Sequence, residues 1–361
     1  MERTIKKVLS AIEKNGFEAY IVGGYVRDLM LDKISWDIDI CTNALPKDLV
    51  KMFPNSNVGI YGAVDFKIGK YSFEITTYRK EFNYENRHPS KVEYINNLLE
   101  DIQRRDFKIN TICMNQNGNI IDLLGATSDI ENHIISSFGD AEAKIKEDPL
   151  RILRAIRFAT VLDFEIDDDL LSCIKKNKEL VLELSDSRII DEMTKILISD
   201  NYLKGLTLLK DLGIAELLLI SYDKVVKTND VNGMWAQLNF KKNLAFNKET
   251  IHNINTIRNI IDNGDVDVFS LYKYGLYFNI VAGEILGINT KKIASLYHHI
   301  PIKCRKDIKI SSTDIMNLLD IKEGEEVGLI LGDLEQAILS SKLANNESEI
   351  KKYLISNYRG E

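Results

Sequence analysis

The sequence predicts an α+β protein, in which a mixed β-sheet near the N-terminus is followed by a long helical region. Three observations support this fold class. Residues 19–42 combine a short apolar strand, a glycine turn, a helix start and a second strand. Two hairpin signals follow, at Gly69-Lys70 and Asn117-Gly118. Beyond residue 138 the hydrophobic residues recur at helical spacing, and strand signals are few.

The first strand, turn and helix form a candidate phosphate site. The apolar run 19–22 is typical of a buried strand, which stops at Gly23-Gly24 before a short helix over 25–31. Glycine lets the backbone approach a ligand closely, and the free N–H groups of a helix start point toward an anion. Arg27 lies on the first helical turn, where its guanidinium can reach a phosphate oxygen. A Gly-Gly pair alone would indicate only a turn.

The second strand carries two carboxylates on one face. Residues 36–40 alternate, which places Asp37 and Asp39 together and Ile38 and Ile40 on the opposite face. Neighbouring carboxylates repel each other unless a cation lies between them. This geometry suits one or two Mg²⁺ ions held against a nucleoside triphosphate. An isolated Asp-x-Asp is usually a solvated strand face, so the functional interpretation depends on its position after the glycine turn.

Composition limits the class of protein. The chain has 361 residues, of which 45% are hydrophobic and 28% charged, as in an ordinary soluble globular protein. No apolar stretch is long enough to span a membrane, and residues 1–17 form an amphipathic helix without a signal core, so a cytoplasmic protein is expected. The four cysteines contain no C-x-x-C pair and fit neither a disulfide framework nor a zinc site. The net charge of -7 argues only weakly against a nucleic-acid partner, since a local basic surface is what counts.

The remaining segments give a coarse map of the fold. Residues 79–91 are polar, charged and aromatic without a period, which predicts a mobile loop. Residues 98–114 show a helical pattern, and residues 223–234 are polar enough to predict a loop. Helices are expected over 45–52, 142–160, 170–184, 188–198 and 202–212.

Two further groups of residues can carry chemistry. Arg105 and Asp106 belong to an Arg-Arg-Asp-Phe run, in which arginine donors suit phosphate and the aspartate can accept from a ribose hydroxyl. The alternative is a charge pair on a surface helix. The second group follows Asp148-Pro149, a good helix start, and places Arg151, Arg154 and Arg157 on one broad helix face. The alternative is a capped helix with a solvated face.

These motifs together resemble a known family. GGYVRD…DIDICT, RRDFKIN and EDPLRILRAIRF, in this order, are similar to the motifs of class II tRNA nucleotidyltransferases, which comprise CCA-adding enzymes and bacterial poly(A) polymerases. SDSRIIDEMTKIL at 185–197 is similar to the family's fifth motif, and the C-terminal region resembles that of bacterial CCA-adding enzymes. The resemblance covers nearly the whole chain. It implies a polymerase-β-like head over 1–137 and an all-α neck (138–200), body (201–305) and tail (306–361) in a seahorse shape.

The resemblance also implies a role for each matching residue. Asp37 and Asp39 would be catalytic and hold Mg²⁺. Gly24 and Arg27, beside Gly23, would hold the triphosphate, and Arg105 and Asp106 would contact the ribose and phosphates. Asp148 and Arg151 would read the base, with Arg154 and Arg157 lining the nucleotide pocket. The neck would recognise the base, while body and tail would bind tRNA.

The function implied is addition of C, C and A to tRNA 3′ ends from CTP and ATP without a nucleic-acid template. Attack of the 3′ hydroxyl on the α-phosphorus needs positioning and charge stabilisation, and no protein nucleophile. Alternatives within the family are an A-only enzyme, a CC-only enzyme and a poly(A) polymerase. A catalytically dead RNA-binding relative is the alternative of another class. No membrane and no protein partner are inferred.

Overall fold

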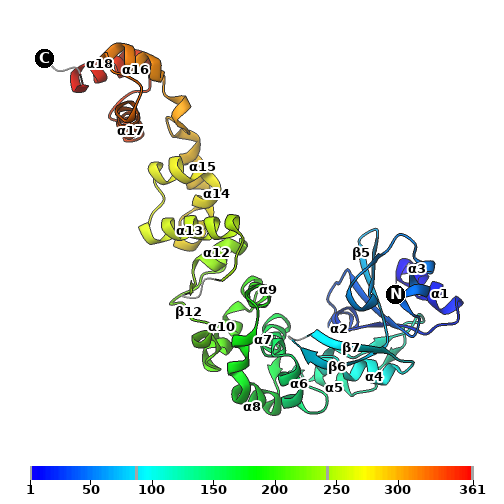
Figure 1. Cartoon of the computed structure of the whole chain (residues 1–361). Helices are drawn as coiled ribbons and strands as arrows, with labels where there is room; N and C mark the ends of the chain where they lie inside the picture. The colour runs from blue at the N-terminus through cyan, green and yellow to red at the C-terminus, as the bar shows by residue number, and fades with distance from the viewer. Residues whose placement is uncertain (1, 86–87, 241–243, 359–361) are drawn as a thin grey trace. The chain divides into compact units, whose positions relative to one another are not determined.

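The computed structural model describes residues 2–85, 88–240 and 244–358. Internal contacts divide the chain into two compact units. The first comprises Met1–Ile220 and Phe240–Leu244, and the second Ser221–Asn239 and Ala245–Glu361. Strands in blue and cyan precede the green helices of the first unit in Figure 1, and the second unit is almost entirely helical. The predicted α+β class, with an N-terminal mixed sheet followed by helices, is confirmed.

A seven-stranded sheet forms the centre of the first unit, in the order β3-β4-β5-β2-β1-β8-β9. It is mixed, because β2 and β5 run parallel while the other pairs are antiparallel. On β2, Ile38 and Ile40 are fully buried whereas Asp37 is exposed, as the alternation predicted. The strands are β1 (Ala19–Val22), β2 (Asp37–Thr42), β3 (Asn57–Val58), β4 (Val64–Ile68), β5 (Tyr71–Thr77), β8 (Cys113–Met114) and β9 (Ile120–Ile121).

The loop predicted over 79–91 is wrong. Strands β6 (Arg79–Glu85) and β7 (His88–Tyr94) pair as an antiparallel hairpin, and only residues 86–87 of that segment lie outside the described residues. The register sets Lys80 opposite Glu93 and Phe82 opposite Lys91, whose ammonium lies 5.8 Å from the ring centre. Cross-strand pairs of this kind stabilise a hairpin without the apolar alternation on which the prediction depended.

Short helices cover the sheet. The amphipathic helix α1 (Arg3–Lys14) buries one apolar face. The helical pattern over 98–114 ends early, because α4 (Leu98–Gln103) is followed by a turn in which the carboxylate of Asp106 accepts from the backbone N–H of Phe107. Such a local bond competes with helix continuation. The other helices here are α2 (Gly24–Met30), α3 (Pro46–Met52), α5 (Ala126–Glu131) and the 3₁₀ turns η1 (Ile60–Gly62) and η2 (Lys108–Asn110).

The helix expected over 142–160 is two helices, α6 (Ala141–Glu147) and α7 (Leu150–Leu162). The break lies at Asp148, which is extended (φ -141°, ψ 96°), because Pro149 disfavours the helical conformation of the residue before it. The rest of this unit comprises α8 (Asp168–Asn177), η3 (Lys178–Glu183), α9 (Asp186–Ile198), α10 (Tyr202–Asp211), α11 (Ile214–Leu217) and the parallel pair β10 (Ile134–Ile135) and β11 (Glu165–Ile166).

The second unit corrects the loop predicted over 223–234. Helix α12 (Val231–Ala236) begins inside it, where the carboxylate of Asp230 accepts from the N–H of Gly233. From residue 220 onward the other elements are β12 (Ile220–Ser221), β13 (Asn239–Phe240), α13 (Lys248–Asn263), α14 (Val268–Leu286), α15 (Thr290–His299), η4 (Arg305–Asp307), α16 (Ser312–Leu319), α17 (Glu325–Leu339) and α18 (Glu347–Tyr358).

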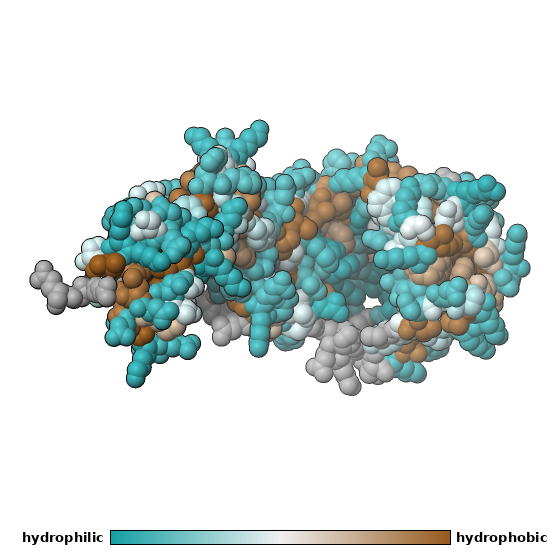
Figure 2. Space-filling view, turned by 90° about the horizontal axis from the view of Figure 1, so that it is seen from above, coloured by the Kyte–Doolittle hydropathy of each residue, from teal (hydrophilic) through white to brown (hydrophobic). Residues whose placement is uncertain are grey.

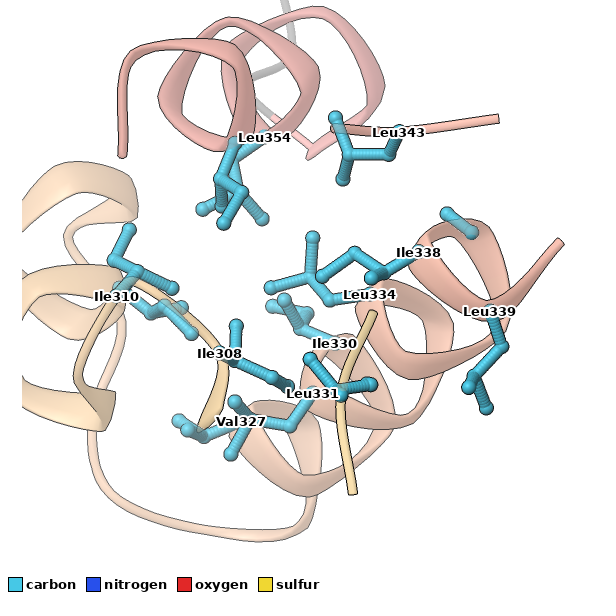
Figure 3. Close-up of a cluster of buried hydrophobic side chains, with 14 residues drawn as sticks. Ile308, Ile310, Val327, Ile330, Leu331, Leu334, Ile338, Leu339, Leu343 and Leu354 are labelled. Carbon is cyan, nitrogen blue, oxygen red and sulfur yellow. The ribbon is translucent and has the colours of Figure 1, made fainter. Parts of the chain in front are cut away.

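An apolar cluster, here called the tail core, holds the C-terminal helices together. Figure 3 shows side chains of α17 and α18 converging with Ile308 and Ile310, and Leu334 lies at the centre with no exposed surface. Among the described residues, no helix is long and apolar enough to cross a bilayer. The face seen in Figure 2 is mostly hydrophilic, with hydrophobic residues in separate patches.

Candidate active site

One pocket of about 780 Å³ in the first unit brings together segments that are distant in sequence. Its walls are the turn after β1, strand β2, residues 104–110, helix α7 and the end of α9. A volume of this size is typical of small-ligand sites. Asp37 does not line the pocket and is exposed at the start of β2. All the other predicted site residues line it: Gly23, Gly24, Arg27, Asp39, Arg105, Asp106, Asp148, Arg151, Arg154 and Arg157.

The turn at Gly23 cannot be built from another residue without strain. Its φ is +79°, and a Cβ there would lie 3.3 Å from Oδ2 of Asp39 and 3.8 Å from Nη1 of Arg105. Glycine is therefore required both for the backbone conformation and for the space beside a carboxylate. The turn leaves a cradle between Asp39 and the start of α2, as expected for a site that admits a phosphate group.

Asp39 belongs to a row of carboxylates that sequence analysis missed in part. Asp39 lies opposite Glu74 on β5, which lies opposite Asp65 on β4. Burial raises the pKa of Asp39, the charge of Asp37 adds to this, and Arg105 opposes it. Glu74 is exposed, yet lost hydration and the charges of Asp39 and Asp65 raise its pKa. The register of the paired strands β2, β5 and β4 brings these carboxylates into one row. In the sequence, only the alternation of residues 71–77 could have indicated the row.

Such a concentration of negative charge fits a cation. The described residues contain no group of three His, Cys, Asp or Glu side chains arranged to hold a metal ion by themselves. A cation beside Asp37 and Asp39 would therefore take further oxygen ligands from a bound nucleotide. This arrangement suits a divalent cation that retains open positions for phosphate and water.

A chain of buried and partly buried hydrogen bonds links Arg27 to α7. Nη1 of Arg27 donates to Oδ1 of Asn110 (2.6 Å), and Nδ2 of Asn110 donates to Oδ1 of Asp106 (3.0 Å). The other oxygen of Asp106 accepts from Nε of Arg154 (2.8 Å). Burial favours the protonated acid, but the charge of Arg154 and the bonds from Asn110 and Arg154 hold the pKa of Asp106 well below its usual range. Asp106 thus orients Arg154 directly and Arg27 through Asn110.

A second chain fixes the arginine pair. Asp101 is fully buried and accepts from Nη2 of Arg104 (2.9 Å) and Nη2 of Arg105 (3.5 Å). Glu81 on β6 accepts from Nη1 of Arg104 (3.2 Å), so the hairpin is tied to this turn. Nε of Arg105 is buried and has no hydrogen-bond partner among the described residues. Arg105 also lines the pocket, so the rest of its guanidinium group can contact a phosphate oxygen there.

Asp148 and Arg151 lie at the junction of α6 and α7. The N-cap of α7 is Pro149, and Oδ1 of Asp148, one residue earlier, accepts from the N–H of Leu150 at the start of the helix (3.1 Å). Nη1 of Arg151 donates to the carbonyl of Lys144 (2.7 Å), and Nζ of Lys144 donates to the carbonyl of Arg105 (2.9 Å). Burial, with the charge of Arg151, lowers the pKa of Lys144 to about 8. These bonds fasten the first turn of α7 to the turn that carries Arg105.

The middle of α7 places an aromatic ring among cations. Phe158 lines the pocket although it is only 8% exposed. Arg157 forms an ion pair with Glu192 of α9 (Nε to Oε2, 3.1 Å). Burial and the nearby charge of Arg154 lower the pKa of Arg157 to about 10. The pocket therefore concentrates positive charge in a partly dry wall, which suits a polyanionic ligand.

A mixed sheet with a glycine turn, an Asp-x-Asp strand and a cationic pocket defines a nucleotidyltransferase head. Models of known families match the chain in three segments. Residues 19–136 match "Poly A polymerase head domain", 163–224 match "Probable RNA and SrmB- binding site of polymerase A", and 217–354 match "tRNA nucleotidyltransferase domain 2 putative".

Similarity to individual proteins extends over the whole chain. A "CCA-adding enzyme" of Lactobacillus johnsonii is 33% identical, and the alignment covers 97% of this chain and 96% of that protein. The crystal structure of a Bacillus stearothermophilus CCA-adding enzyme in complex with CTP has a TM-score of 0.87 at 24% identity, covering 99% of this chain and 98% of the other. A Thermotoga maritima CCA-adding enzyme complexed with tRNA has a TM-score of 0.68 at 16% identity, covering 99% and 96%. The chain belongs to the CCA-adding enzyme family of nucleotidyltransferases, which confirms the resemblance seen in its motifs.

Proposed function

We propose that this protein adds C, C and A to the 3′ end of tRNA, using CTP and ATP and no nucleic-acid template. The observation that carries the proposal is one pocket that joins the glycine turn, Asp39 and the pair Asp148 and Arg151. The family relationship over 97% of the chain supports it. Because tRNA, CTP and ATP are intracellular molecules, we place the reaction in the cytoplasm.

The chain's own residues bind and orient the nucleotide. Gly23, Gly24 and Arg27 hold the triphosphate at the start of α2. Arg105, which lines the pocket, contacts phosphate, and Asp106 accepts from the ribose while it orients Arg154. Arg154 and Arg157 supply positive charge along α7. The 3′ hydroxyl of the RNA attacks the α-phosphorus in line, and pyrophosphate leaves.

Asp37 and Asp39 are the residues that would hold Mg²⁺. Their fit rests on the raised pKa of Asp39 and on the space that Gly23 leaves beside its carboxylate. A Mg²⁺ ion held there would supply Lewis-acid activation of the attacking hydroxyl and charge neutralisation for the leaving pyrophosphate. Glu74, next in the row, adds negative charge that favours a cation at this edge of the sheet.

Base choice follows from the pairing edges of the bases. Cytosine and adenine each present an amino donor beside a ring-nitrogen acceptor, whereas uracil and guanine present the reverse. Asp148 accepts and Arg151 donates, so the pair matches C and A and opposes U and G. The neck (138–200) therefore reads the base in this proposal, while body (201–305) and tail (306–361) bind the tRNA.

The test is extension of a tRNA transcript that lacks its 3′ end, with Mg²⁺ and each nucleotide singly and in pairs. CTP alone is expected to add two residues, ATP alone none, and both together CCA. Addition of A only, or of CC only, would identify a partial enzyme. A long A tract on RNA other than tRNA would identify a poly(A) polymerase. No extension of any RNA, with tRNA binding retained, would identify a dead relative.

A further inference from the structure

Three guanidinium groups in the pocket share one aromatic ring. The guanidinium carbons of Arg27, Arg154 and Arg157 lie 5.3, 5.4 and 4.1 Å from the ring centre of Phe158. All three distances fall within the range of cation–π attraction. The arginines come from two separate helices, α2 and α7, so this convergence is created by the fold and not by sequence spacing alone.

The three cations would repel one another without compensation. Arg154 and Arg157 are three residues apart on α7, where like charges destabilise a helix. Each arginine uses its N–H edge for one carboxylate, namely Asp28 for Arg27, Asp106 for Arg154 and Glu192 for Arg157. The flat faces of the guanidinium groups then remain to be supported, and the electron-rich face of an aromatic ring supplies that support.

The ring itself is held firmly. Phe158 packs edge-on against the buried Phe107, with ring centres 5.8 Å apart and an interplanar angle of 82°. Phe107 directly follows Asp106, the residue that orients Arg154. The ring and the carboxylate that fix Arg154 are therefore positioned by the same turn.

We propose that Phe158 is a positioning residue, whose ring aligns Arg27, Arg154 and Arg157 as a single receptor for the triphosphate of the incoming nucleotide. The inference rests on the proposed function, because it deepens the role of that same pocket. It assigns to Phe158 a part in affinity for the triphosphate and none in the choice of base. Its ligand chemistry is a polyphosphate chain, with or without a nucleoside.

The experiment compares Phe158→Leu with Phe158→Tyr. Leucine retains a large apolar side chain without a π face, whereas tyrosine retains the ring. We expect F158L to raise KM for CTP and ATP on the order of tenfold, with KM for tRNA and kcat little changed, and F158Y to stay near wild type. Inorganic tripolyphosphate should inhibit F158L about tenfold less strongly than it inhibits wild type, as expected if the substitution weakens binding of the phosphate chain. Discrimination against UTP should persist in F158L.

Phe164→Leu is the matched control for loss of a buried ring. Phe164 is 1% exposed, lies beside His133 and does not line the pocket. We expect F164L to lower the melting temperature and to leave KM for CTP unchanged. Equal affinity of wild type and F158L for tripolyphosphate would overturn the inference, as would equal losses in F158Y and F158L. If wild type itself binds neither CTP nor tripolyphosphate, the proposed function fails instead.

Discussion

The wall of the pocket and the tail core bury different kinds of side chain. Along α7, buried and partly buried arginines meet carboxylates and backbone carbonyls, and Arg151 is only 8% exposed. The tail core buries aliphatic side chains without a charged group among its members. Burying charges is expensive even when they are paired, whereas apolar burial stabilises directly. The comparison therefore separates residues kept for binding and chemistry from residues kept for stability.

The largest effect should come from the carboxylates of β2. Asp37→Ala or Asp39→Ala should reduce nucleotidyl transfer on the order of a thousandfold or more, because each removes a ligand for the catalytic cation. The melting temperature should not fall, since the Asp39 carboxylate is poorly accommodated when ionised. Single-turnover rates and thermal melts of the same samples measure both.

Asp65→Ala is the control for this pair, because Asp65 is the outer member of the same row. It should retain most of the activity. Near-normal turnover of either β2 variant with Mg²⁺ would show that these aspartates do not hold the metal.

The tail core should respond in the opposite way. Leu334→Ala should destabilise the second unit by about 2–5 kcal/mol, because the lost contacts leave a cavity in a fully buried site. CTP binding should remain, since the pocket lies wholly in the first unit. The control is Leu329→Ala on the same helix, whose side chain is 74% exposed.

The two tryptophans make this measurement specific. Trp36 lies in the first unit and Trp235, 1% exposed, in the second. In a Trp36→Phe background, fluorescence during denaturant unfolding reports on the second unit alone. A loss of CTP affinity in L334A as large as its loss of stability would refute the separation between the two regions.

Sequence analysis located the pocket residues because each lies in a local motif. The turn at Gly23 and the face shared by Arg154 and Arg157 follow from spacing along one segment. Contacts between segments had no such signal. Asp101 falls within the helical pattern over 98–114, and nothing in that pattern indicates that it is buried. In the structure it is fully buried beneath two arginines. Phe158 carries the same apolar signal as its core neighbours, and only the approach of α2 makes it part of the pocket.

The predictions of secondary structure that were wrong failed for related reasons. The hairpin of β6 and β7 depends on pairs such as Lys80 with Glu93, which exist only after the strands meet. The sequence indicated a helix start at Asp148-Pro149, yet a single helix was expected over 142–160. Proline removes a backbone donor and restricts the residue before it, and this was sufficient to predict the break between α6 and α7.

Base choice should show a smaller effect than catalysis. Asp148→Ala combined with Arg151→Ala should lower the use of CTP and ATP. It should also narrow the discrimination between CTP and UTP by about 1–3 kcal/mol, or roughly 5-fold to 150-fold. Some stability should also be lost, because Asp148 accepts from the N–H of Leu150. Competition between CTP and UTP in single-turnover assays measures the gap.

Glu147→Ala is the control for this double variant, since Glu147 contacts Arg151 (3.3 Å) but is half exposed. It should discriminate as wild type does. Wild-type discrimination in the double variant would leave Asp148 with the role of a helix cap alone.

The smallest effect tests the cost of a buried charge inside the pocket wall. Burial and the charge of Arg151 lower the pKa of Lys144 from 10.5 to about 8. Below pH 8 both folded and unfolded chains hold the proton. Between pH 8 and 10.5 the folded chain has released it while the unfolded chain retains it, so unfolding takes up a proton and stability rises with pH. The bonds from Nζ to the carbonyls of Gln103 and Arg105 persist, because a neutral amine still donates.

Lys144→Met isolates this contribution, because it removes the titrating group and retains a long side chain. The free energy of unfolding of wild type minus that of K144M should rise between pH 8 and 10.5, on the order of 1 kcal/mol for a side chain that retains some contact with solvent. Denaturant unfolding of both proteins at matched pH values gives this difference, in which the other titrating groups cancel. A difference that stays flat or falls over this range would mean that the charged lysine is well accommodated. Burial of the Lys144 charge would then carry no cost, and the contrast between the pocket wall and the tail core would not hold at this position.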